Sequence, residues 1–379
     1  MVQFCILCIS VLVIGSNILV SAKFFQDILE NYEKELLPTW NLSIPLEIHF
    51  DSAPGTLISF VEVEEKIGIT MTLIMNWTDT RLTWIPKDKY DNFIIVTTKE
   101  IWLPYVYHMD SVDGIKPVGY DSHFYAIITA QGQVRWSPGD IFQSKCNTDV
   151  SKFPFDSHSC KLRFMMWISV PGKVELTVES EYPKMKYFFP NSDWSVTKIR
   201  QSISKMDFPI YIVEIYFKRQ PLYYVVTVIL PTLMFSLMNP LVFCLPVESG
   251  ERISLGMTIL LAYTIFLTIV AASIPAKSNP ICVLILVLVL IMLVSAIIVI
   301  FVIITAHFYH KENINEVNPC LKWLSICCQP QSNTYECEGR NTQRLSGKSV
   351  SKGLDIIFAA LSYFLLVVIL STYFIYVMS

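Results

Sequence analysis

The chain of 379 residues is 53% hydrophobic and 16% charged, with a formal net charge of -3 and a pI near 6.1. This length and composition allow one soluble domain together with a membrane domain, and the charge gives no sign of a nucleic-acid partner. The sequence contains no nucleophile–base pair and no metal-ligand constellation, so we expect neither an enzyme nor a bound cofactor or metal.

Residues 1–22 are an apolar run that ends in the small residues Ser21 and Ala22. This pattern predicts a secretory signal peptide that is cleaved near Ala22, although no basic region precedes it. A first membrane-spanning helix is the alternative, but Ser16 and Asn17 interrupt a run that is barely long enough to span. If the peptide is removed, Cys146 and Cys160 are the only cysteines before the long apolar segments and would pair in an oxidising compartment.

Residues 23–220 are predicted to form an extracellular antiparallel β-sandwich. An amphipathic helix is expected first, over residues 23–40, because apolar residues recur there at helical spacing. Short runs of alternating polarity follow, separated by Gly, Pro, Asp and Asn, as is typical of a sandwich. These runs lie at residues 44–50, 68–77, 123–130, 173–180 and 208–217. Glycosylation sequons at Asn41 and Asn76 are compatible with an extracellular region, although Asn76 falls inside an expected strand.

Four uninterrupted apolar segments follow, at about residues 222–246, 253–274, 281–307 and 354–378. Each is long enough to cross the hydrocarbon core of a bilayer as a helix. A buried helix of a soluble protein would not be apolar all round four times, so we reject that alternative. The prediction therefore places three membrane helices in residues 221–307, and the fourth helix with an extracellular C-terminus in residues 354–379.

The orientation follows from the connection at residues 308–353, which is predicted to be a short cytoplasmic loop because it is rich in Lys and Arg. Four spans then place both termini outside, in a multi-pass protein of the plasma membrane. The same orientation puts Cys320, Cys327, Cys328 and Cys337 in the reducing cytosol. A zinc site at these cysteines is the alternative, but their spacing matches no familiar ligand pattern and no histidine lies among them.

The stretch CNTDVSKFPFDSHSC, with thirteen residues between Cys146 and Cys160, resembles the disulfide loop of the Cys-loop family of pentameric ligand-gated ion channels. Further motifs carry the same resemblance and favour the nicotinic, cation-conducting branch: WTDTRLTW, IWLP, GQVRWSP, LYYVVTVILP, FCLPVESGERISLGMTILLAYTIFL and LDIIF. The resemblance implies a β-sandwich followed by a four-helix bundle in contact with membrane lipids. It also implies four further identical or homologous subunits, and a disulfide loop that rests on the membrane domain. A postsynaptic location is a further expectation.

One face of the second span is predicted to line a pore. Steps of three or four residues from Glu251 keep to a single helical face. That face consists of Glu251, Ser254, Thr258, Leu261, Ile265, Thr268 and Ala272. Five copies would give a carboxylate ring, hydroxyl rings and two apolar rings able to stop ions. An amphipathic helix buried in a bundle is the alternative, but it leaves Glu251 unexplained.

The segment Gly250-Glu251-Arg252 resembles the sequence of cation channels in this family, because anion channels carry a Pro-Ala-Arg type sequence there. A ring of carboxylates concentrates cations and repels chloride. Arg252 is expected to turn away from the pore. Ala272 stands where many cation-conducting relatives have an acid, which predicts a lower conductance or divalent permeability.

The resemblance also implies a ligand site of aromatic rings at the subunit interface, which holds a cation by cation–π attraction. Trp167 and Phe208 match two of those positions. The rest of the site departs from the pattern: Met109, Thr72 and Arg200 stand where aromatic residues are expected, and no adjacent cysteine pair occurs between residues 190 and 215. The positive charge of Arg200 is expected to disfavour a small cationic ligand.

The departures suggest a non-alpha subunit whose small extracellular ligand is unknown. Two hypotheses remain open: a subunit that opens a cation pore when ligand binds at its interfaces, or a modulatory or assembly subunit of a heteromeric channel that binds no agonist. Trp167 is as compatible with interface packing as with ligand contact.

Overall fold

The computed structural model describes residues 26–39, 44–86, 92–119, 124–167, 172–205, 208–272, 274, 280–310 and 347–378. The predicted signal peptide, Asn41 and almost all of the predicted cytoplasmic loop with its four cysteines lie outside these residues. The chain forms two compact units. The first comprises residues 1–61, 65–147 and 158–218, and the second comprises residues 62–64, 148–157 and 219–379.

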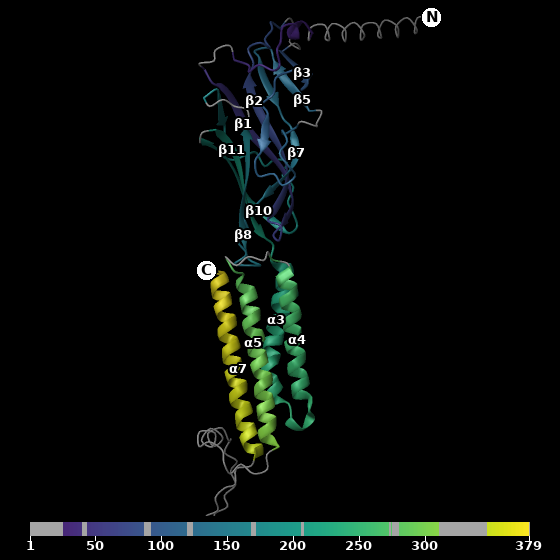
Figure 1. The fold of residues 1–379 in the computed structure, drawn as a ribbon, viewed down its shortest axis with the longest axis vertical. Coiled ribbons are helices and arrows are strands. Elements are labelled where there is room, and N and C mark those ends of the chain that lie inside the picture. The colour runs from purple at the N-terminus through teal and green to yellow at the C-terminus, as the bar shows by residue number, and fades with distance from the viewer. Residues whose placement is uncertain are drawn as a thin grey trace, which may run out of the picture. The chain divides into compact units, whose positions relative to one another are not determined.

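The first unit contains two β-sheets, as the sequence predicts (Figure 1). The seven-stranded sheet has the order β3-β5-β6-β2-β1-β9, with β7 paired to β2. Its strands are β1 (Leu46–Val61), β2 (Lys66–Thr78), β3 (Phe93–Thr97), β5 (Tyr125–Thr129), β6 (Gln133–Trp136), β7 (Gly139–Lys145) and β9 (Val174–Val178). The four-stranded sheet has the order β10-β11-β8-β4. Its strands are β4 (Val106–His108), β8 (Ser157–Met166), β10 (Trp194–Lys205) and β11 (Pro209–Arg219).

Alternating burial along the strands builds the core of this unit. In β8 every second side chain is buried, and β1 shows the same alternation from Leu46 to Pro54, before two register shifts interrupt its pairing with β2. A slip of one residue would expose the whole buried set, so the pattern fixes the register. The largest fully buried side chains include Phe50, Phe164 and Tyr211, and the Tyr211 ring contacts the rings of both phenylalanines.

The helix expected over residues 23–40 is much shorter within the described residues. Only residues 26–29 are helical, and turns follow. Isolated helices of this length are marginal in water, so side-chain docking decides the conformation. The Tyr32 hydroxyl donates to Asp79 at 2.8 Å and accepts the Trp102 backbone N–H at 2.9 Å, which ties the segment to the sandwich.

The second unit contains four helical segments long and apolar enough to cross a membrane, as predicted. The first of these runs through α2 (Leu222–Tyr224), η2 (Val225–Ile229), α3 (Leu230–Met238) and η3 (Asn239–Cys244). The others are α4 (Glu251–Ala272), α5 (Val283–Tyr309) and α7 (Gly347–Met378). Figure 1 shows α3, α4, α5 and α7 side by side, and α5 packs against both α4 and α7.

A π-helical turn interrupts the first of these segments at η2, and Pro231 accounts for it. A proline has no N–H to donate to the carbonyl four residues earlier, here that of Thr227. Hydroxyl groups help to satisfy carbonyls in this stretch: Thr227 donates to Tyr223 at 2.7 Å and Thr232 donates to Val228 at 2.8 Å. These two side-chain hydrogen bonds therefore add to the backbone bonding of the irregular stretch.

Candidate functional site

The face of α4 singled out from the sequence is exposed along its whole length. Its members are Glu251, Ser254, Thr258, Leu261, Ile265, Thr268 and Ala272. The residues that are buried in the bundle lie elsewhere on the helix: Arg252, Gly256, Ile259, Tyr263 and Val270. Of the four apolar segments, α4 is the least buried. The seven residues thus share an uncovered face that changes along the helix from charged to hydroxylated to aliphatic.

The hydroxyl groups of this face are anchored to the backbone of α4. Thr258 donates to the Ser254 carbonyl at 2.9 Å, and Thr268 donates to the Ile265 carbonyl at 2.7 Å. Each hydroxyl oxygen keeps lone pairs with which it can accept a further bond. Between the two threonines, Leu261 and Ile265 expose 61% and 52% of their surface, so an apolar band separates the hydroxylated positions.

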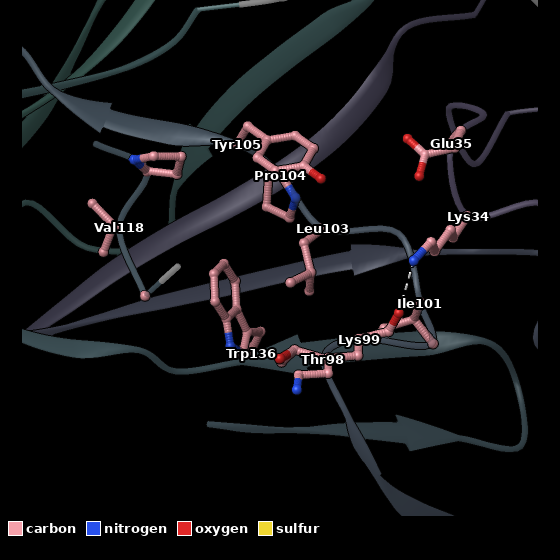
Figure 2. Close-up of a pocket in the computed structure, with 12 residues that line it drawn as sticks. Lys34, Glu35, Thr98, Lys99, Ile101, Leu103, Pro104, Tyr105, Val118 and Trp136 are labelled. Carbon is pink, nitrogen blue, oxygen red and sulfur yellow. Dashed lines mark hydrogen bonds between the residues drawn. The ribbon is translucent and has the colours of Figure 1, made fainter. Parts of the chain in front are cut away.

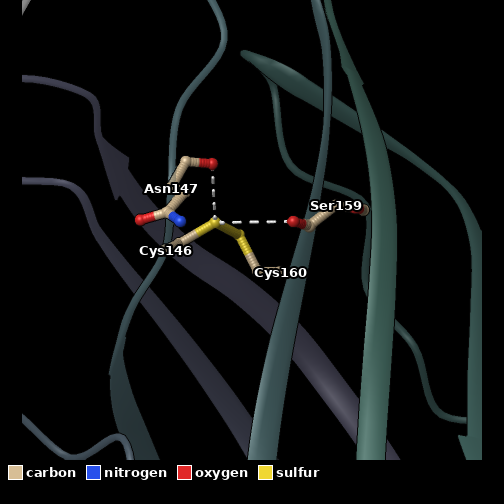
Figure 3. The surroundings of a disulfide bond; sticks show 4 residues. All are labelled: Cys146, Asn147, Ser159 and Cys160. Atoms are coloured by element: carbon tan, nitrogen blue, oxygen red, sulfur yellow. Dashed lines mark hydrogen bonds between the residues drawn. A yellow bond between two sulfur atoms is a disulfide. The ribbon is translucent and has the colours of Figure 1, made fainter.

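The predicted disulfide between Cys146 and Cys160 is present, with Cα atoms 5.2 Å apart (Figure 3). Both cysteines are buried. The Cys146 sulfur lies 3.7 Å from the Asn147 carbonyl oxygen and 3.8 Å from that of Ser159. The bond therefore closes the loop inside the core of the first unit.

The middle of the disulfide loop, residues 148–157, belongs to the second unit. Phe153 is buried there, with its ring centroid 4.8 Å from that of Tyr224. The Tyr373 hydroxyl of α7 donates to the Phe153 carbonyl at 3.3 Å, and the Val283 N–H of α5 donates to the Ser151 carbonyl at the same distance. The loop thus packs directly on three of the membrane segments.

Arg219 organises this packing, and no local sequence pattern indicates its partners. Its guanidinium donates to both carboxylate oxygens of Asp156, at 2.7 and 3.0 Å, and to Glu62 at 2.5 Å. It also lies 4.8 Å from the ring centroid of Phe153. Burial alone would lower the pKa of Arg219, but the hydrogen bonds and negative charges of Asp156 and Glu62 outweigh burial and raise it. The guanidinium therefore stays charged and paired.

Most residues of the predicted ligand site lie on or beside the four-stranded sheet. Trp167 follows β8 and is 58% exposed, Phe208 precedes β11 and is 39% exposed, and Met109 is 37% exposed. Tyr107, which sequence reasoning passed over, lies edge-on to Trp167 with ring centroids 6.0 Å apart. Because alternate residues of a strand share a face, Tyr107 offers an aromatic ring near the position where Met109 lacks one.

Arg200 and Thr72 complete the predicted set. The Arg200 guanidinium contacts the Glu181 carboxylate at 2.5 Å in a pair whose side chains are about half exposed. Thr72 lies on β2 of the other sheet, in a shallow depression that it shares with Phe124 and Asp140. Within one chain, then, the structure does not bring Thr72 together with the other four residues.

A separate pocket of about 170 Å³ lies in the first unit beside Trp136 (Figure 2). Its walls include Leu103, Tyr105 and Gly119, and Lys34 donates to the Lys99 carbonyl at its edge. None of the predicted ligand-site residues lines this pocket. Trp136 itself is buried, so its indole serves the packing of the sandwich.

The comparisons with known proteins agree with this architecture. Residues 21–221 match the family described as neurotransmitter-gated ion-channel ligand binding domain, and residues 228–373 match the neurotransmitter-gated ion-channel transmembrane region. The chain therefore belongs to the neurotransmitter-gated ion-channel family, which is a family of channels and not of enzymes. Together with the four apolar helical segments, this membership indicates a multi-pass plasma-membrane protein with an extracellular N-terminal domain.

The relatives point to the nicotinic branch. The chain is 30% identical over 264 residues to the neuronal acetylcholine receptor subunit alpha-3 of Homo sapiens, covering 68% of this chain and 52% of that subunit. It is 31% identical over 256 residues to the neuronal acetylcholine receptor subunit beta-4 of Gallus gallus, covering 66% and 54%. The chain thus spans about half the length of the curated relatives that it matches.

Proposed function

We propose that this chain is a subunit of a pentameric, cation-selective channel, in which the exposed face of α4 lines the pore and an extracellular ligand controls opening. The observation that carries the proposal is the uncovered face of α4, with Glu251 at one end and the Leu261 and Ile265 band beyond it. A single copy leaves this face without cover, whereas five copies around an axis would turn it into the wall of a channel.

Charge supports the choice of cations. Glu251 is exposed, while the adjacent Arg252 is buried and only 6% exposed. The pore mouth would therefore present carboxylates without the neighbouring guanidinium groups, and a ring of like charge raises the local concentration of ions of opposite sign.

The selectivity of the pore is tested by Glu251→Ala, made together with a Gly250 substitution toward the anion-type sequence. Whole-cell currents are recorded while external NaCl is diluted, and we expect the reversal potential to shift toward that of chloride. Ser371→Ala in α7, far from α4 in sequence and exposed, serves as the control and should leave the reversal potential unchanged. If the two variants behave alike, Glu251 does not set selectivity.

The aromatic rings beside the four-stranded sheet bear on the ligand. Trp167, Tyr107 and Phe208 retain aromatic rings on the four-stranded sheet, and the pairing of Arg200 with Glu181 reduces the repulsion of a cation. These features support ligand binding at a subunit interface, with the Thr72 face of a neighbouring subunit opposite. Acetylcholine is the natural first probe, because the matched relatives are acetylcholine receptor subunits.

A modulatory or assembly role in a heteromeric, postsynaptic channel is the second candidate. The specific observation that favours it is the loss of aromatic residues at Met109 and Thr72. Expression of the chain alone, and then together with an alpha-3 type subunit, separates the two candidates. Acetylcholine-evoked current from the chain alone supports the first, whereas current only on co-expression supports the second.

A further inference from the structure

A buried guanidinium lies at the start of α4, directly after Glu251. Arg252 donates from Nη1 and Nη2 to the two carboxylate oxygens of Asp355 in α7, each at 3.0 Å. The same guanidinium donates to the Leu245 carbonyl at 2.6 Å and to the Phe243 carbonyl at 3.1 Å. Both members of the ion pair are nearly inaccessible, with side chains exposed by 7% and 10%.

These four hydrogen bonds join three segments of the second unit: the end of the first apolar segment, the start of α4 and the start of α7. A bidentate pair between planar groups fixes orientation as well as distance. Charged residues this close to the apolar core of a membrane helix are costly unless they are paired, so the pairing is a strong constraint on the bundle. Asp355 is separated from Arg252 by 103 positions in the chain.

We propose that Arg252 and Asp355 are positioning residues that aim Glu251 at the pore. The inference rests on the proposed function, because it assumes that Glu251 acts at the mouth of a channel. Successive residues of a helix point about 100° apart. Holding the Arg252 side chain against α7 therefore sets the direction in which the Glu251 side chain leaves the helix.

The connection that precedes α4 does not by itself fix the direction of the Glu251 side chain. Gly250 has a left-handed φ of +71°, and the space around it is open, so the connection can turn at this point. The nearby pair of Glu248 and Lys348 is exposed, with side chains 69% and 64% accessible, and an exposed pair constrains little. The buried pair therefore ties the first turn of α4 to another helix, in addition to the packing of α4 against α5.

The test adds Asp355→Asn or Arg252→Lys to a chain that already carries Leu261→Ser, which provides a steady current. Each variant is compared with the Leu261→Ser chain alone, which is called the background. Asp355→Asn removes the charge with little change of shape, and Arg252→Lys keeps the charge but loses the planar fork. Lys352→Gln is the matched control, because it removes an exposed charge one turn earlier in α7. Surface labelling verifies that each variant reaches the membrane.

We expect both variants of the pair to show a several-fold fall in the ratio of sodium to chloride permeability, although no predicted pore-lining residue is changed relative to the background. Lys352→Gln should keep the ratio of the background. If Asp355→Asn and Arg252→Lys channels at the cell surface have the same ratio of sodium to chloride permeability as the background, the proposal is overturned.

Two further measurements separate positioning from simple stability. The double variant Arg252→Met with Asp355→Leu replaces the pair by apolar groups that bundles often tolerate, and we expect it to reach the surface yet remain poorly selective. If it is as selective as wild type, the pair only stabilises the bundle. The second measurement is the rate at which a thiol reagent labels Glu251→Cys in permeabilised cells, which requires no current. The chain used for it has serine in place of the other thiols that the reagent could reach, at Cys244, Cys320, Cys327, Cys328 and Cys337. A rate that Asp355→Asn leaves unchanged would also contradict the proposal.

The same experiments distinguish this inference from the proposed function. If Glu251→Ala alters selectivity and Asp355→Asn does not, the channel assignment stands and the positioning role fails. If Glu251→Ala has no effect on selectivity, the assignment of the pore mouth fails, and a changed labelling rate of Glu251→Cys in Asp355→Asn then shows only that the ion pair orients the side chain at position 251.

Discussion

At the scale of single residues, His108 carries a titratable group in the core of the first unit. It is 5% exposed, and its ring packs against those of Phe142 and Phe164, with centroids 5.6 and 5.2 Å away. Within the described part of the chain its Nε2 atom has no hydrogen-bond partner. Burial lowers the pKa of His108 to about 4, although nearby carboxylates, chiefly that of Asp110, act in the opposite direction.

This pKa predicts a loss of stability in mild acid. An unfolded histidine titrates near pH 6.5, so between about pH 6.5 and pH 4 the unfolded chain binds a proton that the folded chain excludes, and stability falls as the pH is lowered. The full loss in the free energy of unfolding is about 3 kcal/mol.

In His108→Phe the free energy of unfolding should depend less on pH across this window, as measured by thermal unfolding of the full chain in detergent at pH 7 and pH 5. A pH dependence in His108→Phe identical to that of the wild type would contradict the assignment.

At the scale of elements, the disulfide loop is shared between two cores. Its cysteines are buried in the first unit, while Phe153 and Asp156 are buried in the second. The pairing of Asp156 with Arg219 links the loop to the end of β11, and the contact of Phe153 with Tyr224 links it to α2. Residues of this one loop therefore take part in the cores of both units.

Loss of the disulfide should abolish assembly at the cell surface. Closing a loop of this length lowers the entropy of the unfolded chain, which stabilises the folded state by about 3 kcal/mol. Cys146→Ser loses that stabilisation. Surface biotinylation followed by sizing of the detergent-extracted protein measures the result. Cys244→Ser, at an exposed free cysteine, is the control and should assemble normally. Surface assemblies of Cys146→Ser in normal amount would show that the bond is dispensable.

At the scale of the whole molecule, the proposed pentamer explains why one face of α4 is uncovered in a single chain. Leu261 is 61% exposed in one copy, and five copies of it would meet at the axis of a closed pore. A narrow apolar ring excludes ions because it cannot replace their hydration. Tyr263, two residues along, is fully buried and contacts the Ser236 hydroxyl at 3.0 Å, so it faces the bundle and not the pore.

Leu261→Ser or Leu261→Thr should hydrate this ring and favour the open state. The lost apolar contact is worth on the order of 1 kcal/mol per subunit, and five subunits act together, so even part of it would change the opening equilibrium several-fold. We expect leak current or greater agonist sensitivity in voltage-clamp recordings, and Tyr263→Phe should show neither. Conducting Leu261 variants with unchanged leak and sensitivity would place the gate elsewhere.

Patterns that depend only on neighbours along the chain were readable from the sequence. The alternation in β8 and β11, the four apolar segments and the exposed face of α4 follow from the periods of strands and helices. The disulfide was also predictable, because both cysteines lie within one short and distinctive loop. The fold class and the family therefore follow from local patterns and motifs in the amino-acid sequence alone.

The pairings of distant charges were decided only by the tertiary structure. Arg219 meets Glu62 and Asp156 across 157 and 63 positions, and Arg252 meets Asp355 across 103. Nothing in the local sequence distinguishes these charges from exposed ones, because burial and partners depend on which segments the packing brings together. Sequence periodicity specifies which way a side chain faces on its own element, and the fold specifies what it faces.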